Sequence, residues 1–392
     1  MAASRLAQQV VVHRSIAAPA ARAPALFVAS DFCRQPGFGR HHPLSIPRVS
    51  AVLELCASLG WIDDRCMRTS RIATVAELEA FHDAGYVEAL RSSDAAGRVE
   101  PAVRERHGFG NFENPLFPGV FERAATAVGG SILAAEFALE GRVAFHPAGG
   151  THHGRRDRAS GFCYFNDPVF AIRRLLEAGR SRVLYVDLDA HHGDGVQEAF
   201  LDEPRVRVVS IHEQGRWPYS GAADDVGRGH ACNLPVPAGF NDSELEHLLD
   251  TVVLPLAARF APQAVVVTCG TDALAGDPLS GLALSNVALW DAVERVIADT
   301  GAAVVLGGGG YNPWTLARCW TGLWGRLGGR DIPDELPGPA QQILCSLECD
   351  LVEDEDVDES WCRTLADAPR TGTVREEVKL LARRGRALHG MA

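Results

Sequence analysis

Short apolar runs alternate along the chain with longer stretches that have the periodicity of helices. The apolar runs lie at 143–145, 183–186, 206–209, 264–267 and 302–306. The helix-like stretches are 120–140, 167–178, 243–259, 286–299 and 315–327. Uninterrupted apolar runs are typical of strands that are buried on both faces of a parallel sheet. We therefore predict an α/β fold with a single open, mostly parallel sheet and helices on both faces.

Each apolar run ends in polar or glycine-rich sequence, and the run at 183–186 has the densest cluster. It is followed by Asp187, Asp189, His191, His192 and Asp194. Charged groups at the end of a buried strand cost free energy unless they are paired or bind a metal. A hydrogen-bonded turn with capping aspartates would account for about one of these five residues. Aspartate and neutral histidine together suit Zn²⁺, whereas an all-oxygen set would suit Mg²⁺ or Ca²⁺.

Another strand end precedes the adjacent histidines His152 and His153, within the glycine-rich segment 147–154. Glycines allow tight turns and a close approach to a ligand. Imidazoles titrate near neutral pH and are therefore suited to general acid–base catalysis. A pair of histidines is often a capping or surface feature, but the setting at a strand end favours catalysis here.

Two further strand ends supply one candidate each. Asp272, in segment 270–278, would complete an Asp-His-Asp ligand set that leaves a metal position open, or it caps the following turn. The four glycines at 307–310 have neither the Lys-Ser/Thr of a P-loop nor GxGxxG spacing, so we do not expect a phosphate-binding loop. We expect these glycines to position Tyr311, whose hydroxyl can donate to a developing oxyanion.

Composition limits the remaining alternatives. The 392 residues are 46% hydrophobic and 22% charged, as in ordinary globular proteins. No apolar stretch reaches the roughly 18 residues of a membrane span, and the net charge of −12 argues against direct nucleic-acid binding. The ten cysteines form no CxxC pair and favour buried reduced thiols in a cytoplasmic protein. The sequence leaves open whether the chain forms a homo-oligomer.

We expect three segments along the chain. Residues 1–23 contain arginines but no acidic residue, and we predict a disordered arm there. Residues 24–337 would form the catalytic domain. Residues 338–392 include an acidic tract and a basic, helix-like tail at 374–388, and we expect them to pack on that domain as an appendix.

The motifs together resemble the histone deacetylase and acetoin-utilisation protein family, which has the arginase–deacetylase fold. The resemblance runs from about Arg40 to Leu336, and the segments 114–119 and 147–150 look most like bacterial members. Its motifs are His42-Pro43, 114–119, His152-His153, 159–167, 187–195, 270–278, 307–312 and 317–320.

This resemblance implies a role for individual residues. Zinc would be held by Asp189, His191 and Asp272. The catalytic residues would be His152, His153 and Tyr311, with Asp187 and Asp194 orienting the two histidines. The substrate-binding residues would be Phe162, Trp217, Gly161, Leu279 and Gly309. Arg48 would assist acetate release. A structural K⁺ would be held by Asp187, Asp189, His191, Ser210 and Ile211.

The implied activity is that of a zinc-dependent amidohydrolase that removes acetyl groups from lysine side chains of proteins or peptides. Leu279 replaces the acidic gatekeeper of polyamine deacetylases, and Phe162 with Trp217 would line an apolar sleeve. Acetylpolyamines or other small acyl-amines are the alternative substrates, which acidic residues near the mouth (Glu113, Asp224 and Asp225) would favour.

Two other functions are less consistent with the motifs. A binuclear manganese ureohydrolase would have Asp-x-His-x-Asp spacing, but His192-Gly193 adds a residue before Asp194, and no Asp follows Asp272 two positions later. A non-catalytic acyl-lysine binder would be expected to have lost Tyr311 or the histidine pair. Which histidine transfers the proton stays open.

Overall fold

A single sheet of eight parallel strands forms the centre of the molecule in this computed structural model, which describes residues 23–35 and 37–391. The strand order is β2-β1-β3-β8-β7-β4-β5-β6, and every pairing is parallel. The predicted open, mostly parallel sheet is confirmed. The strands are β1 (Ala23–Ala29), β2 (Met67–Thr69), β3 (Arg142–His146), β4 (Val183–Asp187), β5 (Val206–Glu213), β6 (Ala231–Val236), β7 (Ala264–Thr268) and β8 (Ala303–Leu306).

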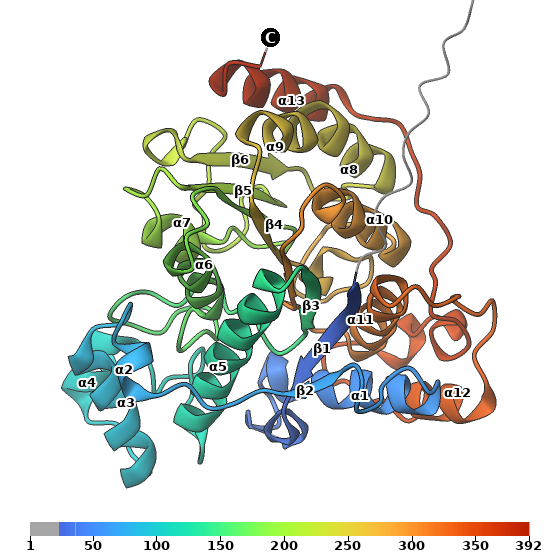
Figure 1. The fold of residues 1–392 in the computed structure, drawn as a ribbon. Helices are drawn as coiled ribbons and strands as arrows, with labels where there is room; N and C mark the ends of the chain where they lie inside the picture. Colours follow the sequence, from blue (N-terminus) through green and yellow to red (C-terminus); the bar gives the residue numbers. More distant parts are fainter. Residues whose placement is uncertain (1–22, 36, 392) are drawn as a thin grey trace, which may run out of the picture.

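Helices cover both faces of the sheet (Figure 1). The core on one face of the sheet includes residues of α2 (Val75–Leu78), α3 (Ala84–Ala96), α5 (Val120–Leu139), α6 (Asp167–Glu177) and α7 (Asp194–Ala199). The core on the other face includes residues of α1 (Val49–Ser58), α8 (Asp242–Leu248), α9 (Leu254–Phe260), α10 (Asn286–Ile297), α11 (Pro313–Leu327), α12 (Gly338–Cys345) and α13 (Glu376–Leu388). The short helix α4 spans Pro101–His107.

The two cores explain the uninterrupted apolar runs of the sequence. In β4, Leu184 and Val186 face one core while Val183 and Tyr185 face the other, and all four are buried. Because side chains alternate along a strand, a strand with helices on both sides needs apolar residues at every position.

Three strands were missing from the sequence prediction. β1 follows an alanine- and arginine-rich segment, and β2 is a three-residue edge strand, too short for a recognisable pattern. Asn233 and Pro235 interrupt the apolar pattern of β6, which a strand at the edge of the sheet tolerates. The predicted helix at 243–259 is divided by a π-helical turn at Leu249–Val253 into α8 and α9.

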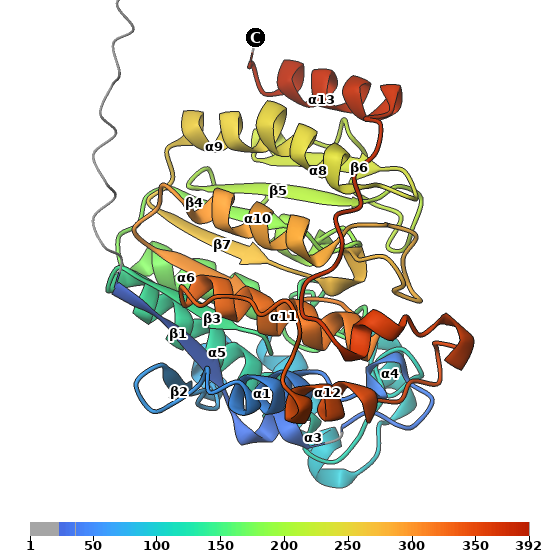
Figure 2. The same cartoon turned by 90° about the vertical axis from the view of Figure 1, so that its right-hand side faces the viewer.

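The C-terminal segment packs along the face that carries α8 to α11 (Figure 2). α12 lies against α1, and α13 lies against β6 and α8. Buried Arg318 of α11 binds this segment through Asp367, whose Oδ1 lies 2.6 Å from Nη1. The division into arm, domain and appendix stays a prediction, and residues 1–22 of the predicted arm lie outside the described residues.

Within the described part of the chain, no helix is both long and apolar enough to cross a bilayer. The cytoplasmic location and the homo-oligomer stay predictions. Cys56, Cys163, Cys232, Cys269 and Cys319 are buried free thiols, whereas Cys345 is exposed, which departs from the predicted burial.

Strand register places the ends of the central strands at one level. Asp187 at the end of β4 pairs with Ser210 of β5 and with Thr268 of β7. Leu306 at the end of β8 pairs with Thr268 and with His146 of β3. The loops that follow these strands therefore meet at one edge of the sheet, where ligands of parallel α/β folds bind.

Candidate active site

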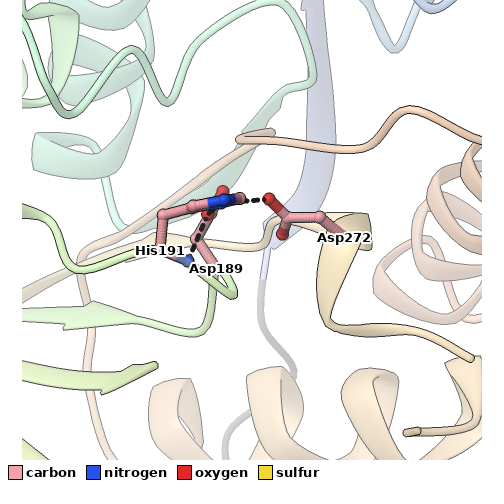
Figure 3. Close-up of side chains that lie close together, drawn as sticks. All are labelled: Asp189, His191 and Asp272. Carbon is pink, nitrogen blue, oxygen red and sulfur yellow. Dashed lines mark hydrogen bonds and ion pairs between the residues drawn. The ribbon is translucent and has the colours of Figure 1, made fainter. Parts of the chain in front are cut away.

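A buried Asp-His-Asp cluster lies where the loops after β4 and β7 meet (Figure 3). Asp189 and His191 follow β4, and Asp272 belongs to the 3₁₀ turn Thr271–Ala273 after β7. One potential ligand atom from each residue lies within 4.8 Å of the other two. Nδ1 of His191 lies 2.9 Å from Oδ2 of Asp272 and 3.3 Å from Oδ1 of Asp189. Spacing alone left Asp272 as a ligand or a turn cap, and the structure brings it to the cluster.

The two carboxylates of this cluster attract a positive charge, and against the effect of burial they raise the pKa of His191 between them to about 10. Burial raises the pKa of Asp272 to about 6, and the nearby Asp189 carboxylate adds to the shift. Two buried carboxylates at this distance repel each other unless a positive charge lies between them. Carboxylate oxygens with an imidazole nitrogen are suitable ligands for a divalent ion such as Zn²⁺. The donor set therefore fits a single metal ion.

Glycines provide the clearance that the two carboxylates need. A Cβ at Gly270 would lie 2.2 Å from Oδ2 of Asp189, and a Cβ at Gly309 would lie 2.1 Å from Oδ2 of Asp272. The backbone N–H of Gly309 also donates to Oδ2 of Asp189 at 2.6 Å. The glycine-rich loop after β8 thus lies directly against the cluster.

Two histidine–aspartate pairs lie beside the cluster. Nδ1 of His152 lies 2.7 Å from Oδ2 of Asp187, and Nδ1 of His153 lies 2.8 Å from Oδ1 of Asp194. The imidazole centroids are 4.0 Å apart, and all four side chains are buried. Both Nδ1 atoms therefore donate to carboxylates, so Nε2 is the nitrogen of each ring that can gain or lose a proton.

The two histidines differ in their electrostatic surroundings. Burial lowers the pKa of His152, but the charges of Asp187 and Asp189 outweigh burial and raise it to about 9. Burial and the neighbouring His152 lower the pKa of His153 to about 3, against the opposing effect of Asp194. This difference favours a cationic His152 beside a neutral His153.

Tyr311 is held next to the cluster by its neighbours in the chain. Its backbone N–H donates to Oδ2 of Asp277 at 2.7 Å. Asn312 then caps α11, because its side chain accepts from the N–H groups of Trp314 and Thr315. Burial keeps the pKa of the Tyr311 hydroxyl well above its ordinary value, so the hydroxyl stays protonated and can donate.

An open pocket of about 570 Å³ leads to these groups. Phe162 and Trp217 lie on its walls, with the ring centroids of Trp217 and His153 4.6 Å apart. A Cβ at Gly161 would lie 2.4 Å from the Trp217 ring, so only glycine leaves room for the indole. Its lining comprises Phe112, Glu113, His153, Gly161, Phe162, His191, Glu213, Gly215, Arg216, Trp217, Tyr219, Leu279 and Tyr311.

The histone deacetylase domain model matches residues 42–327, which is more than half of the chain. The chain belongs to the histone deacetylase family. The acetoin utilization protein AcuC of Bacillus subtilis (strain 168) is 34% identical over 329 residues, which are 80% of this chain and 84% of that protein. Histone deacetylase 8 of Xenopus tropicalis is 34% identical over 298 residues, which are 74% and 80% of the two chains.

Solved structures of this family have the same fold. A crystal structure of an HDAC homolog from Aquifex aeolicus has a TM-score of 0.89 and 38% sequence identity, covering 93% of this chain and all of that one. An HDAC homolog complexed with SAHA has a TM-score of 0.88, 38% identity and the same coverage. The predicted family and its arginase–deacetylase fold are therefore confirmed.

Two predicted site residues of this histone deacetylase family member, Arg48 and Gly309, do not line the first pocket. Arg48 is half-buried, donates to the carbonyl of Gly308 and lies 5.1 Å from the centroid of the Trp320 ring. It lines a second cavity of about 350 Å³. Gly309 contacts the cluster through its backbone and is not among the residues that line the first pocket.

The residues named for a potassium site lie around the end of β4 and the middle of β5. Asp187 and Ser210 are register partners, and Ile211 follows in β5. Oγ of Ser210 lies 2.9 Å from Nδ1 of His212. The potassium site and the individual roles of the site residues stay predictions.

Sequence reasoning missed two charged residues, one that lines the pocket and one that binds Asp194. Glu213 is the last residue of β5, and its carboxylate pairs with Arg216 at 2.5 Å and accepts from the N–H of Gly281 at 2.8 Å. The strand-end rule that found Asp187 could also have found Glu213. Arg155 binds Asp194 with an N–O distance of 2.5 Å, and no pattern in the sequence signals this contact.

Proposed function

We propose that this chain is a zinc-dependent deacetylase that removes acetyl groups from lysine side chains of proteins or peptides. The observation that carries the proposal is the convergence of one Asp-His-Asp cluster, two histidine–aspartate pairs and Tyr311 beside a single pocket. Asp189, His191 and Asp272 would hold the ion. When bound, zinc supplies Lewis acidity to the acyl carbonyl and to the attacking water.

His153 is the better candidate for proton transfer. It lines the pocket, and its neutral imidazole has Nε2 available because Nδ1 is engaged by Asp194. We propose that His153 accepts a proton from the attacking water and then delivers it to the leaving amine. His152 would stay cationic and stabilise the developing negative charge.

Tyr311 would donate its hydroxyl hydrogen to the acyl oxygen as negative charge develops there. Asp277 supports this role because it fixes the backbone of Tyr311. Phe162 and Trp217 would enclose the apolar part of the substrate, with Gly161 and Leu279 beside them. Arg48 would assist departure of acetate, and a structural K⁺ would be held around Asp187 and Ser210.

The charges at the mouth favour lysine side chains over polyamines. Glu213 is neutralised by Arg216, and one oxygen of Glu113 accepts from the N–H of Gly161 at 2.7 Å. Asp224 pairs with Arg384 at 3.1 Å, and Asp225 accepts from Gln197 at 2.7 Å. Neither Asp224 nor Asp225 lines the pocket.

Glu113 is therefore the one acidic residue of the described pocket lining without an arginine partner within ion-pair distance. This carboxylate favours acetylpolyamines or other small acyl-amines as the second candidate class of substrate. A second ammonium of such a substrate could bind Glu113.

The decisive assay compares an acetyl-lysine peptide, N-acetylputrescine and N8-acetylspermidine at one pH with zinc-replete enzyme. We expect the highest kcat/KM for the peptide. Glu113→Gln should leave this order unchanged. A clear preference for an acetylpolyamine that Glu113→Gln abolishes would replace the lysine substrate by a polyamine and leave the zinc amidohydrolase in place.

A further inference from the structure

The two histidine–aspartate pairs differ in what holds the carboxylate. Asp187 accepts from the hydroxyl of Tyr185 at 2.7 Å and from the N–H of Asp189 at 3.2 Å, both uncharged donors. Asp194 instead binds Arg155, whose Nη2 lies 2.5 Å from Oδ2. In the described chain, His152 is the one side chain that forms an ion pair with Asp187, so arginine contacts only the Asp194 pair.

The oxygens of Asp194 are bound in a way that fixes the plane of the carboxylate. Oδ1 accepts from Nδ1 of His153 and from the N–H of Gly195, both at 2.8 Å, while Oδ2 accepts from Arg155. Only 5% of the Asp194 side chain is exposed. A carboxylate that is held from both oxygens cannot rotate away from the imidazole without breaking a charge-assisted hydrogen bond.

Arg155 is itself anchored at both ends. Its backbone follows His153 after a single glycine, and its N–H donates to the carbonyl of Arg158 at 2.9 Å. Its guanidinium also binds Glu198 of α7, the helix that Asp194 begins. Arg155 therefore connects the loop that carries His153 to the helix that carries Asp194.

We propose that Arg155 is a positioning residue that keeps the Asp194 carboxylate aligned with Nδ1 of His153 and thereby holds the imidazole in place for proton transfer. This inference rests on the proposed function, in which His153 transfers the proton. Arg155 does not line the substrate pocket, so its loss should change kcat and leave KM nearly unchanged.

The test uses Arg155→Met and Arg155→Lys, with Arg156→Met as the matched control. Arg156 is the next residue, pairs with Asp83 and is 67% exposed. We expect Arg155→Met to lower kcat by about 10- to 100-fold, the range typical of groups that orient the residues of a metal site without binding the metal, with zinc content unchanged. Arg155→Lys should restore most of the rate, and Arg156→Met should behave like the parent.

A second readout does not depend on activity. The Nδ1–H proton of His153 should give a downfield NMR resonance, assigned by its disappearance in His153→Gln. We expect it to shift or broaden in Arg155→Met, to recover in Arg155→Lys and to stay in place in Arg156→Met. An unchanged resonance or an unchanged kcat in Arg155→Met would overturn the inference.

The two readouts separate this inference from the proposed function. If the parent enzyme does not hydrolyse acetyl-lysine or an acetylpolyamine, the proposed function is wrong, while the resonance still reports whether Arg155 positions the pair. A fall in kcat that Arg155→Lys does not reverse, together with a matching loss of thermal stability, would assign Arg155 a purely structural role and overturn the inference.

Discussion

Replacing Tyr311 with phenylalanine separates its proposed chemistry from its contribution to packing. The side chain is 6% exposed, and its ring lies 5.9 Å from that of Phe162 between centroids. The substitution keeps this ring and the backbone bond to Asp277, and it removes only the hydroxyl. We therefore expect the free energy of unfolding to change by less than about 1 kcal/mol, as for substitutions that preserve packing.

The rate should respond much more strongly than the stability. Loss of one donor to an oxyanion costs about 10²–10³ in kcat, or about 2.7–4 kcal/mol of transition-state stabilisation. The assay is acetate release from an acetyl-lysine peptide at saturating substrate. Zinc content is measured on the same sample and should equal that of the parent, because Tyr311 is not a ligand in this account.

Tyr86→Phe is the matched control at another buried tyrosine. The Tyr86 hydroxyl donates to the carbonyl of Tyr164 at 2.5 Å, and the ring is fully buried. Its loss should lower the free energy of unfolding by about 1–3 kcal/mol, because a buried carbonyl loses its partner, and leave kcat unchanged. If Tyr311→Phe keeps kcat within a few-fold of the parent, or loses stability as Tyr86→Phe does, our reasoning about the hydroxyl is refuted.

Two further substitutions test how the C-terminal segment and the metal cluster are held. Asp367→Ala leaves the fully buried guanidinium of Arg318 without its carboxylate partner. We therefore expect the free energy of unfolding, measured in urea, to fall by about 3–5 kcal/mol. A fall of less than about 1 kcal/mol would contradict a stabilising role for this ion pair. Gly309→Ala places a Cβ 2.1 Å from Oδ2 of Asp272, so we expect it to weaken zinc binding at least about tenfold. Gly85→Ala, which has open space at its Cβ, should leave zinc affinity unchanged. Equal zinc affinity in the two variants would show that the clearance at Gly309 is unimportant.

The central sheet could be predicted from the sequence because burial on both faces leaves a clear signal. β3, β4, β7 and β8 each contain an uninterrupted apolar run, and Arg207 alone interrupts the run at 206–209 in β5. β2 and β6 are edge strands with weaker patterns, since an edge strand is not packed on all sides. The π-helical turn at Leu249–Val253 has no sequence signal that we recognised.

The cluster could be anticipated because its residues follow strands whose ends lie at one level. Parallel register places Asp189 and Asp272 at the same edge of the sheet, although they are 83 positions apart in the sequence. The partner of each histidine came from the family resemblance, since spacing alone does not pair His153 with Asp194. Contacts such as Arg155 with Asp194 depend on how two loops meet, which no periodic pattern encodes.

The most direct test of the account measures zinc and deacetylation on one preparation. The purified protein is assayed for bound zinc and for acetate release from an acetyl-lysine peptide, before and after chelation and again after zinc is returned, with Asp189→Ala alongside. We predict one zinc ion per chain, loss of activity on removal, recovery on return, and neither zinc nor activity in Asp189→Ala. Full turnover by a preparation verified to be free of metal would contradict the account.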